Sequence, residues 1–303
     1  MSYSEHHYRS NDGLKLYYRV YGSNENVLIC LPGLTRNCKD FEKLAEHLAS
    51  GWTVITPDLR GRGQSEHDPK FRNYRPGTYV SDTWSLLDSL GLTRVVVIGT
   101  SLGGLMAMIM ADQQPQRIRA VVLNDVGPEL PPAAVARILT YAGRTPPADN
   151  WDLASEQVRQ AYALAYPKES ADFWRDFTRL SYRQVDSGKV EPDIDPAIGE
   201  ALRKSRGILK FLQWLRKHGL KRKVGGVNID TWDSFRAISM PCLLLHGEIS
   251  DVLTPEIVGR MIAVNPQLQV CTVPDRGHAP SLDEPVARSA IDGFLDRILQ
   301  TMA

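Results

Sequence analysis

The pattern Gly99-Thr100-Ser101-Leu102-Gly103 constrains the fold more than any other feature, because it links an apolar run directly to a helix-like segment. The run is Arg94–Gly99 (RVVVIG), and the predicted helix extends from Leu102 to about Gln113. A turn this tight puts the serine in a strained backbone conformation and requires glycine at both ends. By itself the pattern also fits a serine N-cap before an apolar helix. The strand before it and the glycines after it favour a serine presented at a helix N-terminus, where developing negative charge is stabilised.

Strand-like and helix-like segments alternate on both sides of this turn. Val95–Ile98 and Val121–Leu123 are continuously apolar, as expected for parallel strands covered by helices on both faces. The alternation predicts an α/β fold with a doubly wound, mostly parallel sheet. The predicted strands are Lys15–Tyr21, Val27–Leu31, Thr53–Pro57, Arg94–Gly99, Ala120–Asn124, Cys242–Leu245 and Val270–Val273. The predicted helices are Cys38–Ala49, Thr78–Leu90, Leu102–Gln113, Pro255–Ala263 and Val286–Thr301.

The alternation is interrupted after Gly127. From there to about Asp233 no β-branched apolar run occurs, and proline-rich joints separate helical patterns. We therefore expect residues 1–127 and 234–303 to form one core and residues 128–233 to form a helical insertion, here called the insertion. Tryptophans in or beside it would line an apolar pocket or, as aromatics at helical spacing more often do, belong to a core. These are Trp151, Trp174, Trp214 and Trp232.

Composition narrows the function classes. The net charge of +1 offers no global field for nucleic acid or an anionic membrane, and the basic run Arg216–Lys223 is typical of a solvated helix end. The polar N-terminus has no signal-peptide core, and no apolar run approaches the roughly 18 residues of a membrane span. With no C-x-x-C pair, we expect the four cysteines to be reduced core residues. These features predict a cytoplasmic protein that binds neither nucleic acid nor membrane.

The ordered set of motifs resembles the α/β-hydrolase family with a helical cap, over nearly the whole chain. The set comprises Leu31-Pro32-Gly33-Leu34, the loop Asp58–Ser65, the serine turn and the late Gly277-His278. In that family the serine is the nucleophile, and the cap enters after the sixth strand of the sheet, where the insertion begins. The resemblance is specific for the fold and weak for the substrate. The loop Asp58–Ser65 lacks both glycine-rich phosphate-binding patterns, so we interpret it as a structural turn at the rim of the site.

A serine nucleophile needs a base, and His278 is the best candidate. It follows the last predicted strand, at the sheet edge where parallel α/β folds bind ligands. His246 is a rival, although it reads better as a structural residue before Gly247. The order serine, acid, histidine then favours Asp251 as the acid that orients the imidazole. Asp125, after strand Ala120–Asn124, and Glu248 remain alternatives.

Acyl transfer also requires two donors for the oxyanion. The resemblance implies the backbone N–H groups of Leu34 and Leu102, with Gly33 leaving room for the substrate. Many relatives have His-Gly where this chain has Pro32-Gly33; the change removes a supporting side chain but keeps the backbone donor.

The expected function is hydrolysis of a small to medium, apolar carboxylic ester, or of a lactone or thioester, by a carboxylesterase-like enzyme. A serine at the turn argues against dehalogenase and epoxide hydrolase chemistry, which use aspartate there. A carbon–carbon hydrolase of the meta-cleavage type and a small-ligand receptor on the same fold remain alternatives. We expect no metal or organic cofactor, and a monomer or homodimer.

Overall fold

The computed structural model describes residues 2–204, 223–224, 227–228 and 230–300. The basic run predicted as a solvated helix end lies outside these ranges except for Lys223, and Trp214 also lies outside them. Among the described residues, no helix is both long enough and apolar enough to cross a membrane.

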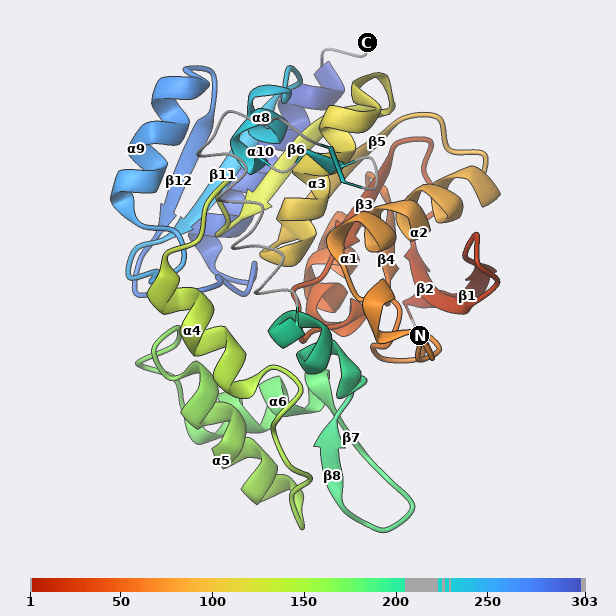
Figure 1. The fold of residues 1–303 in the computed structure, drawn as a ribbon. Coiled ribbons are helices and arrows are strands. Elements are labelled where there is room, and N and C mark those ends of the chain that lie inside the picture. Colours follow the sequence, from red (N-terminus) through yellow and green to blue (C-terminus); the bar gives the residue numbers. More distant parts are fainter. Residues whose placement is uncertain (1, 205–222, 225–226, 229, 301–303) are drawn as a thin grey trace.

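An eight-stranded sheet runs through the core, in the order β1-β2-β4-β3-β5-β6-β11-β12 (Figure 1). Only the pairings β1·β2 and β2·β4 are antiparallel. The other pairings are parallel, as the continuous apolar runs predicted. The strands are β1 (Tyr3–Arg9), β2 (Lys15–Tyr21), β3 (Val27–Leu31), β4 (Thr53–Pro57), β5 (Val95–Thr100), β6 (Ile118–Asn124), β11 (Cys242–Gly247) and β12 (Gln269–Val273).

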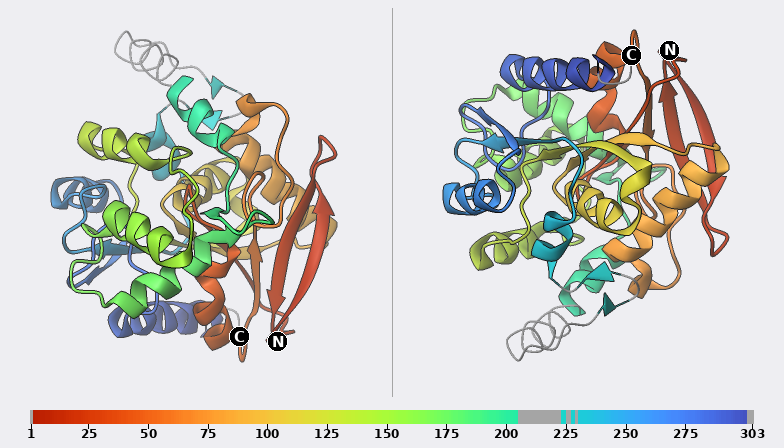
Figure 2. Two further views of the ribbon diagram at one scale, coloured as in Figure 1. Left: turned by 90° about the horizontal axis from the view of Figure 1, so that it is seen from below. Right: turned by 90° about the horizontal axis from the view of Figure 1, so that it is seen from above.

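Helices cover both faces of the sheet, which is the doubly wound arrangement (Figure 2). One face packs against α1 (Glu42–Leu48), which follows the 3₁₀ turn Cys38–Phe41, and against α10 (Pro285–Gln300). The opposite face packs against α2 (Pro76–Ser89), α3 (Leu102–Gln113), α8 (Thr231–Arg236) and α9 (Pro255–Val264). Two short 3₁₀ turns, Phe71–Asn73 and Pro115–Arg117, complete the connections of this half.

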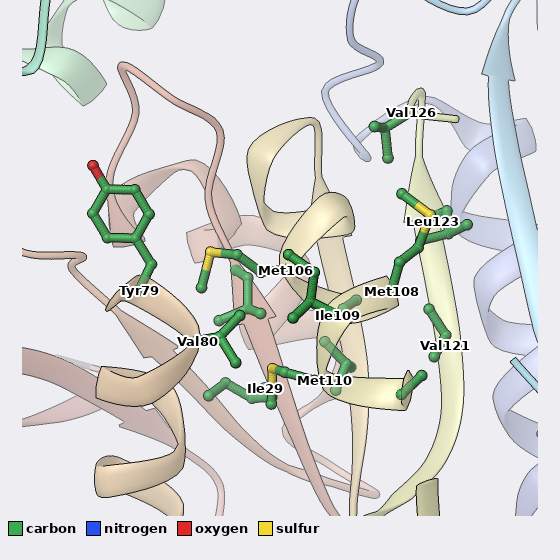
Figure 3. Close-up of a cluster of buried hydrophobic side chains, with 14 of the residues drawn as sticks. Ile29, Tyr79, Val80, Met106, Met108, Ile109, Met110, Val121, Leu123 and Val126 are labelled. Atoms are coloured by element: carbon green, nitrogen blue, oxygen red, sulfur yellow. The ribbon is translucent and has the colours of Figure 1, made fainter. Parts of the chain in front are cut away.

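The helix after the serine turn lies at the centre of the larger core (Figure 3). Met106, Met108 and Met110 of α3 are fully buried, between Val80 of α2 and Leu123 of β6. Burial of a side chain of this size contributes about 1.5–3 kcal/mol to the free energy of folding. Helix α3 is therefore firmly packed, and its N-terminus has a fixed position. Ser101 is thereby presented on a rigid support.

The insertion leaves the core after β6 and lies beside one end of the sheet (Figure 1). It contains α4 (Pro132–Tyr141), α5 (Trp151–Tyr162) and α6 (Ala171–Ser181), and it has its own small core around Trp174. It is not purely helical: β7 (Tyr182–Gln184) pairs with β8 (Val190–Pro192), and β9 (Lys223–Val224) pairs with β10 (Val227–Asn228). These strands of two or three residues are too short to leave a periodic signal in sequence.

Candidate active site

Ser101 lies where the sequence places it, between the end of β5 and the first residue of α3. Its backbone has φ 51° and ψ −111°, a region that non-glycine residues avoid. A Cβ on Gly103 would lie 2.0 Å from the Leu31 carbonyl oxygen, and one on Gly99 would lie 2.4 Å from the Gly103 carbonyl. The tight turn therefore depends on both glycines, as predicted. This backbone conformation ends the strand and places Ser101 before the helix, in the lining of the pocket.

The imidazole of His278 lies between Ser101 and Asp125. Its Nε2 lies 2.8 Å from Ser101 Oγ, and its Nδ1 lies 2.8 Å from Asp125 Oδ2. An ionised carboxylate can only accept a hydrogen bond, so Nδ1 carries the ring proton and Nε2 is free to accept from the serine. Serine, imidazole and carboxylate thus form one continuous hydrogen-bonded chain.

The carboxylate that contacts His278 belongs to Asp125, one of the two alternatives, and not to Asp251, which the sequence favoured. Asp251 turns away and forms a two-point ion pair with Arg137 of α4, at 2.6 and 2.8 Å. Strand order explains the difference. β5 and β6 are neighbours, with Thr100 paired to Asn124, so the next residues, Ser101 and Asp125, leave the sheet at the same level.

The loop after β11 supports Asp125 instead of supplying the acid. Asp125 is fully buried and accepts from Gly247 N at 2.9 Å and from Ser250 Oγ at 2.6 Å, in addition to His278. A buried carboxylate needs such donors, because unpaired burial of its charge is costly. These contacts fix the carboxylate in the orientation that the imidazole requires.

The two other residues weighed at this end of the sheet have structural contacts. His246 is buried, with Nε2 3.0 Å from the Leu253 carbonyl oxygen. Residues 274–284, between β12 and α10, carry His278 and are here called the histidine loop. Glu248 accepts from the backbone N–H of Asp275 at the start of this loop. Neither residue lines the pocket at Ser101.

Residues 32–37, which follow β3, include the predicted donor Leu34 and are here called the oxyanion loop. This loop lies beside Ser101. A Cβ on Gly33 would lie 3.9 Å from Ser101 Cβ, so the backbone approaches the nucleophile closely. Buried Arg62 donates from Nε to the Leu34 carbonyl oxygen at 2.8 Å, and Arg36 N closes a turn onto Gly33 O at 3.2 Å. Leu102 is the first residue of α3, where helix N–H groups have no intrahelical acceptor. Both predicted donors therefore belong to backbone that is fixed next to Ser101.

The loop Asp58–Ser65 supports this arrangement as a structural turn. Asp58 is buried and accepts from Cys38 N and Gln64 N, and a Cβ on Gly63 would overlap its carboxylate. Desolvation raises the pKa of the Asp58 carboxyl, and the two backbone donors oppose that rise. The loop carries Arg62 to the oxyanion loop, which is a role that the sequence did not reveal.

A pocket of about 490 Å³ opens above Ser101 and His278. The loop Gly33–Arg36 and the histidine loop form its base, and the insertion forms its aromatic wall. The tryptophans that the structure describes lie outside the lining, and Trp174 belongs to the insertion's own core. The aromatic and aliphatic residues that the insertion contributes to the lining are Ile138, Tyr141, Tyr162, Tyr166, Phe173, Phe177 and Leu180, and the insertion also contributes the carboxylates Glu169 and Asp176.

The insertion is tied directly to the histidine loop. Tyr166 donates to the Ala279 carbonyl oxygen at 2.5 Å, and Gly277 N donates to the Ala165 carbonyl oxygen at 2.8 Å. Glu169 pairs with Arg276 at 2.6 Å. Sequence patterns gave no sign of these contacts, because they join segments more than a hundred residues apart. They make the position of His278 depend on the insertion.

In the ranges that the structure describes, no group of three or more His, Cys, Asp or Glu side chains is arranged to hold a metal ion. The chemistry that the site offers is a serine hydroxyl with an adjacent imidazole base and backbone donors.

Comparison with known proteins agrees with this architecture. The model of the alpha/beta hydrolase fold family matches residues 26–285. The chain belongs to the α/β-hydrolase fold family. It is 31% identical over 276 residues to the 3-hydroxybutyrate-oligomer hydrolase of Cupriavidus necator, with 89% of each chain covered. It is also 24% identical over 272 residues to the 2-(acetamidomethylene)succinate hydrolase of Mesorhizobium japonicum, covering 89% of this chain and 88% of the relative.

Among solved structures of this family, an alpha/beta hydrolase from Novosphingobium aromaticivorans superposes with a TM-score of 0.85 at 37% identity. The match covers 98% of this chain and 99% of the other. The fold class predicted from the sequence, and the resemblance on which that prediction partly rested, are therefore confirmed.

Proposed function

We propose that this α/β hydrolase is a serine esterase that cleaves carboxylic esters through an acyl-enzyme. The observation that carries the proposal is the hydrogen-bonded chain from Ser101 through His278 to Asp125, with both links at 2.8 Å. A serine is activated in this way by an adjacent, oriented base. The relative named as a 3-hydroxybutyrate-oligomer hydrolase supports an ester substrate.

In the first half-reaction, Ser101 Oγ attacks the carbonyl carbon while His278 Nε2 takes the hydroxyl proton. The carbonyl oxygen becomes an oxyanion, which the N–H groups of Leu34 and Leu102 stabilise. Collapse of this intermediate expels the alcohol, which takes the proton from Nε2. The acyl group is then joined to Ser101 Oγ as an ester.

In the second half-reaction, water gives a proton to His278 Nε2 and its oxygen attacks the acyl carbonyl. Collapse releases the carboxylic acid, and Ser101 recovers its proton. Asp125 stays ionised throughout and stabilises the imidazolium that forms in each half-reaction.

We propose that residues 128–233 act as the substrate cap over the core formed by residues 1–127 and 234–303, since the insertion supplies the pocket's aromatic wall. We further propose an apolar, ester-like substrate and a cytoplasmic enzyme that acts as a monomer or homodimer.

The test is steady-state hydrolysis of p-nitrophenyl esters of increasing acyl length by the wild type and by Ser101→Ala. We expect turnover to fall by several orders of magnitude in the variant, as it does when a triad serine is removed. The acyl length that gives the highest kcat/KM will measure how the 490 Å³ pocket divides between acyl chain and leaving group. Equal rates for the two proteins on every ester would overturn the proposal and favour a carbon–carbon substrate or a ligand-binding role.

A further inference from the structure

Two hydroxyl groups meet inside the pocket, next to the oxyanion loop. Thr35 Oγ1 lies 2.9 Å from Tyr162 Oη, and both residues line the pocket. Thr35 directly follows Leu34, and Tyr162 is the last residue of α5. The two groups therefore lie where core and insertion meet, a short distance from the position assigned to the substrate carbonyl.

The hydroxyl pair of Thr35 and Tyr162 has more O–H donors than it uses. Each hydroxyl has one O–H donor and can accept two hydrogen bonds. One of the two donates across the 2.9 Å contact, which leaves the other O–H group. Within the part of the chain that the structure describes, no acceptor meets that second O–H group. The pair therefore presents one donor to whatever occupies the pocket.

The surroundings of the pair are aromatic. The ring of Tyr162 lies 5.6 Å from that of Tyr141 and 5.4 Å from that of Phe177, between ring centroids. In such a wall an unpaired donor favours a ligand that has an oxygen at that point, because a ligand without one leaves the donor unsatisfied.

Each lysine and arginine that lines the pocket forms an ion pair with a carboxylate. The surroundings of Thr35 and Tyr162 therefore do not favour an anionic ligand. Arg36 stacks over Phe177 at 4.0 Å and donates to both carboxylate oxygens of Asp40. The others also have carboxylate partners: Lys39 with Asp193, Lys43 with Asp283, and Arg276 with Glu169 and Glu284. The group that fits the spare donor is a neutral oxygen.

We propose that Thr35 and Tyr162 form a subsite for a hydroxyl or carbonyl oxygen on the acyl chain of the substrate. The inference rests on the proposed esterase function and narrows its substrate class to oxygen-bearing acyl groups such as 3-hydroxyacyl esters. The name of the Cupriavidus necator relative, a 3-hydroxybutyrate-oligomer hydrolase, agrees with this class. Thr35 and Tyr162 then determine specificity, while Ser101 and His278 carry out the reaction.

The test compares ethyl butyrate with each enantiomer of ethyl 3-hydroxybutyrate, by pH-stat titration of the acid released. The wild type should hydrolyse at least one hydroxy ester with a higher kcat/KM than the butyrate. In the double variant Thr35→Val/Tyr162→Phe, the ratio of the two kcat/KM values should fall about three- to tenfold, the loss expected for one hydrogen bond. A loss of activity that affects both esters equally does not change this ratio of kcat/KM values. The single variants show which hydroxyl donates, since each keeps one O–H group.

Tyr182→Phe is the matched control, because Tyr182 is a buried tyrosine of the insertion outside the pocket lining. Its ratio should equal that of the wild type. The subsite is overturned if the wild type prefers neither hydroxy ester, if the double variant keeps the preference, or if Tyr182→Phe loses it equally. Hydrolysis of ethyl butyrate that depends on Ser101 in such a case would leave the esterase function standing. Failure of the wild type on all the esters would remove both proposals.

Discussion

Asp251 and Arg137 form a two-point ion pair between the loop after β11 and helix α4 of the insertion. This carboxylate follows the strand after the insertion, where the order serine, acid, histidine led us to expect the triad acid. In the structure it connects insertion and core instead. Asp125, which follows β6 directly, accepts the hydrogen bond from His278. The two aspartates therefore have separable roles that substitution distinguishes.

Asp125→Asn should lower kcat on p-nitrophenyl esters about 10⁴-fold, the scale observed when a triad acid is replaced by its amide. The amide can donate to Nδ1, which would leave the proton on Nε2 and prevent it from accepting from Ser101. Asp251→Asn is the matched control, and it should change kcat less than about tenfold because its ion pair is partly exposed. A larger loss for Asp251→Asn than for Asp125→Asn would return the acid to the position predicted from the sequence.

Gly277→Ala should reduce activity while the protein stays folded. A Cβ at Gly277 would lie 2.7 Å from Ala165 Cα, so either the histidine loop or the insertion must shift. A displacement of about 1 Å in a catalytic group costs on the order of a hundredfold in rate, and we expect that loss in kcat/KM. Circular dichroism checks that the fold is retained.

Gly259→Ala provides the comparison for that variant. It adds the same methyl group within α9, where nothing lies within 4 Å of the new Cβ. It should keep full activity and gain about 0.5–1 kcal/mol in the free energy of unfolding from helix propensity. If Gly277→Ala were as active as Gly259→Ala, the contact between insertion and histidine loop would have no catalytic consequence.

Thiol reactivity tests the predicted state of the cysteines. Cys30, Cys38 and Cys242 are buried, and desolvation raises the pKa of all three thiols, that of Cys242 to about 12. Because the thiolate is the reactive form, these groups should not react with Ellman's reagent at pH 8. Only Cys271, which is partly exposed, should react in the native protein.

All four thiols should react in guanidinium chloride, and Cys271→Ser should abolish the native reaction. Two or more thiols reacting rapidly before unfolding would show that the interior opens far more readily than its packing implies.

Most of the sheet could be predicted from the sequence because parallel strands buried on both faces are continuously apolar. Strands such as β3 and β4 begin and end at the predicted residues. β1 (Tyr3–Arg9) was missed, because it lies at the edge of the sheet and most of its side chains are exposed. A strand of that kind lacks an apolar run, and only its pairing with β2 identifies it.

The residues of the candidate active site were predictable to different degrees for similar reasons. Ser101 could be located because a tight turn between strand and helix requires a recognisable set of glycines. Chain order alone does not identify the acid, since several carboxylates follow strands at the same edge of the sheet. One signal favoured Asp125: it follows its strand without an intervening residue, whereas Asp251 lies four residues beyond β11. The contacts of the insertion with the histidine loop had no signal, because they depend on three-dimensional packing between distant segments.

Reaction with a fluorophosphonate, followed by mapping of the modified peptide, tests the central claim most directly. An activated serine displaces fluoride and keeps the phosphonyl group on its oxygen, with the proton passing to the imidazole. We predict one label per chain, located on Ser101, with loss of esterase activity in proportion to labelling and no labelling of His278→Ala on the same timescale. Esterase activity that persists in fully labelled protein, or a label on another residue that accounts for the lost activity, would contradict the Ser101–His278–Asp125 account.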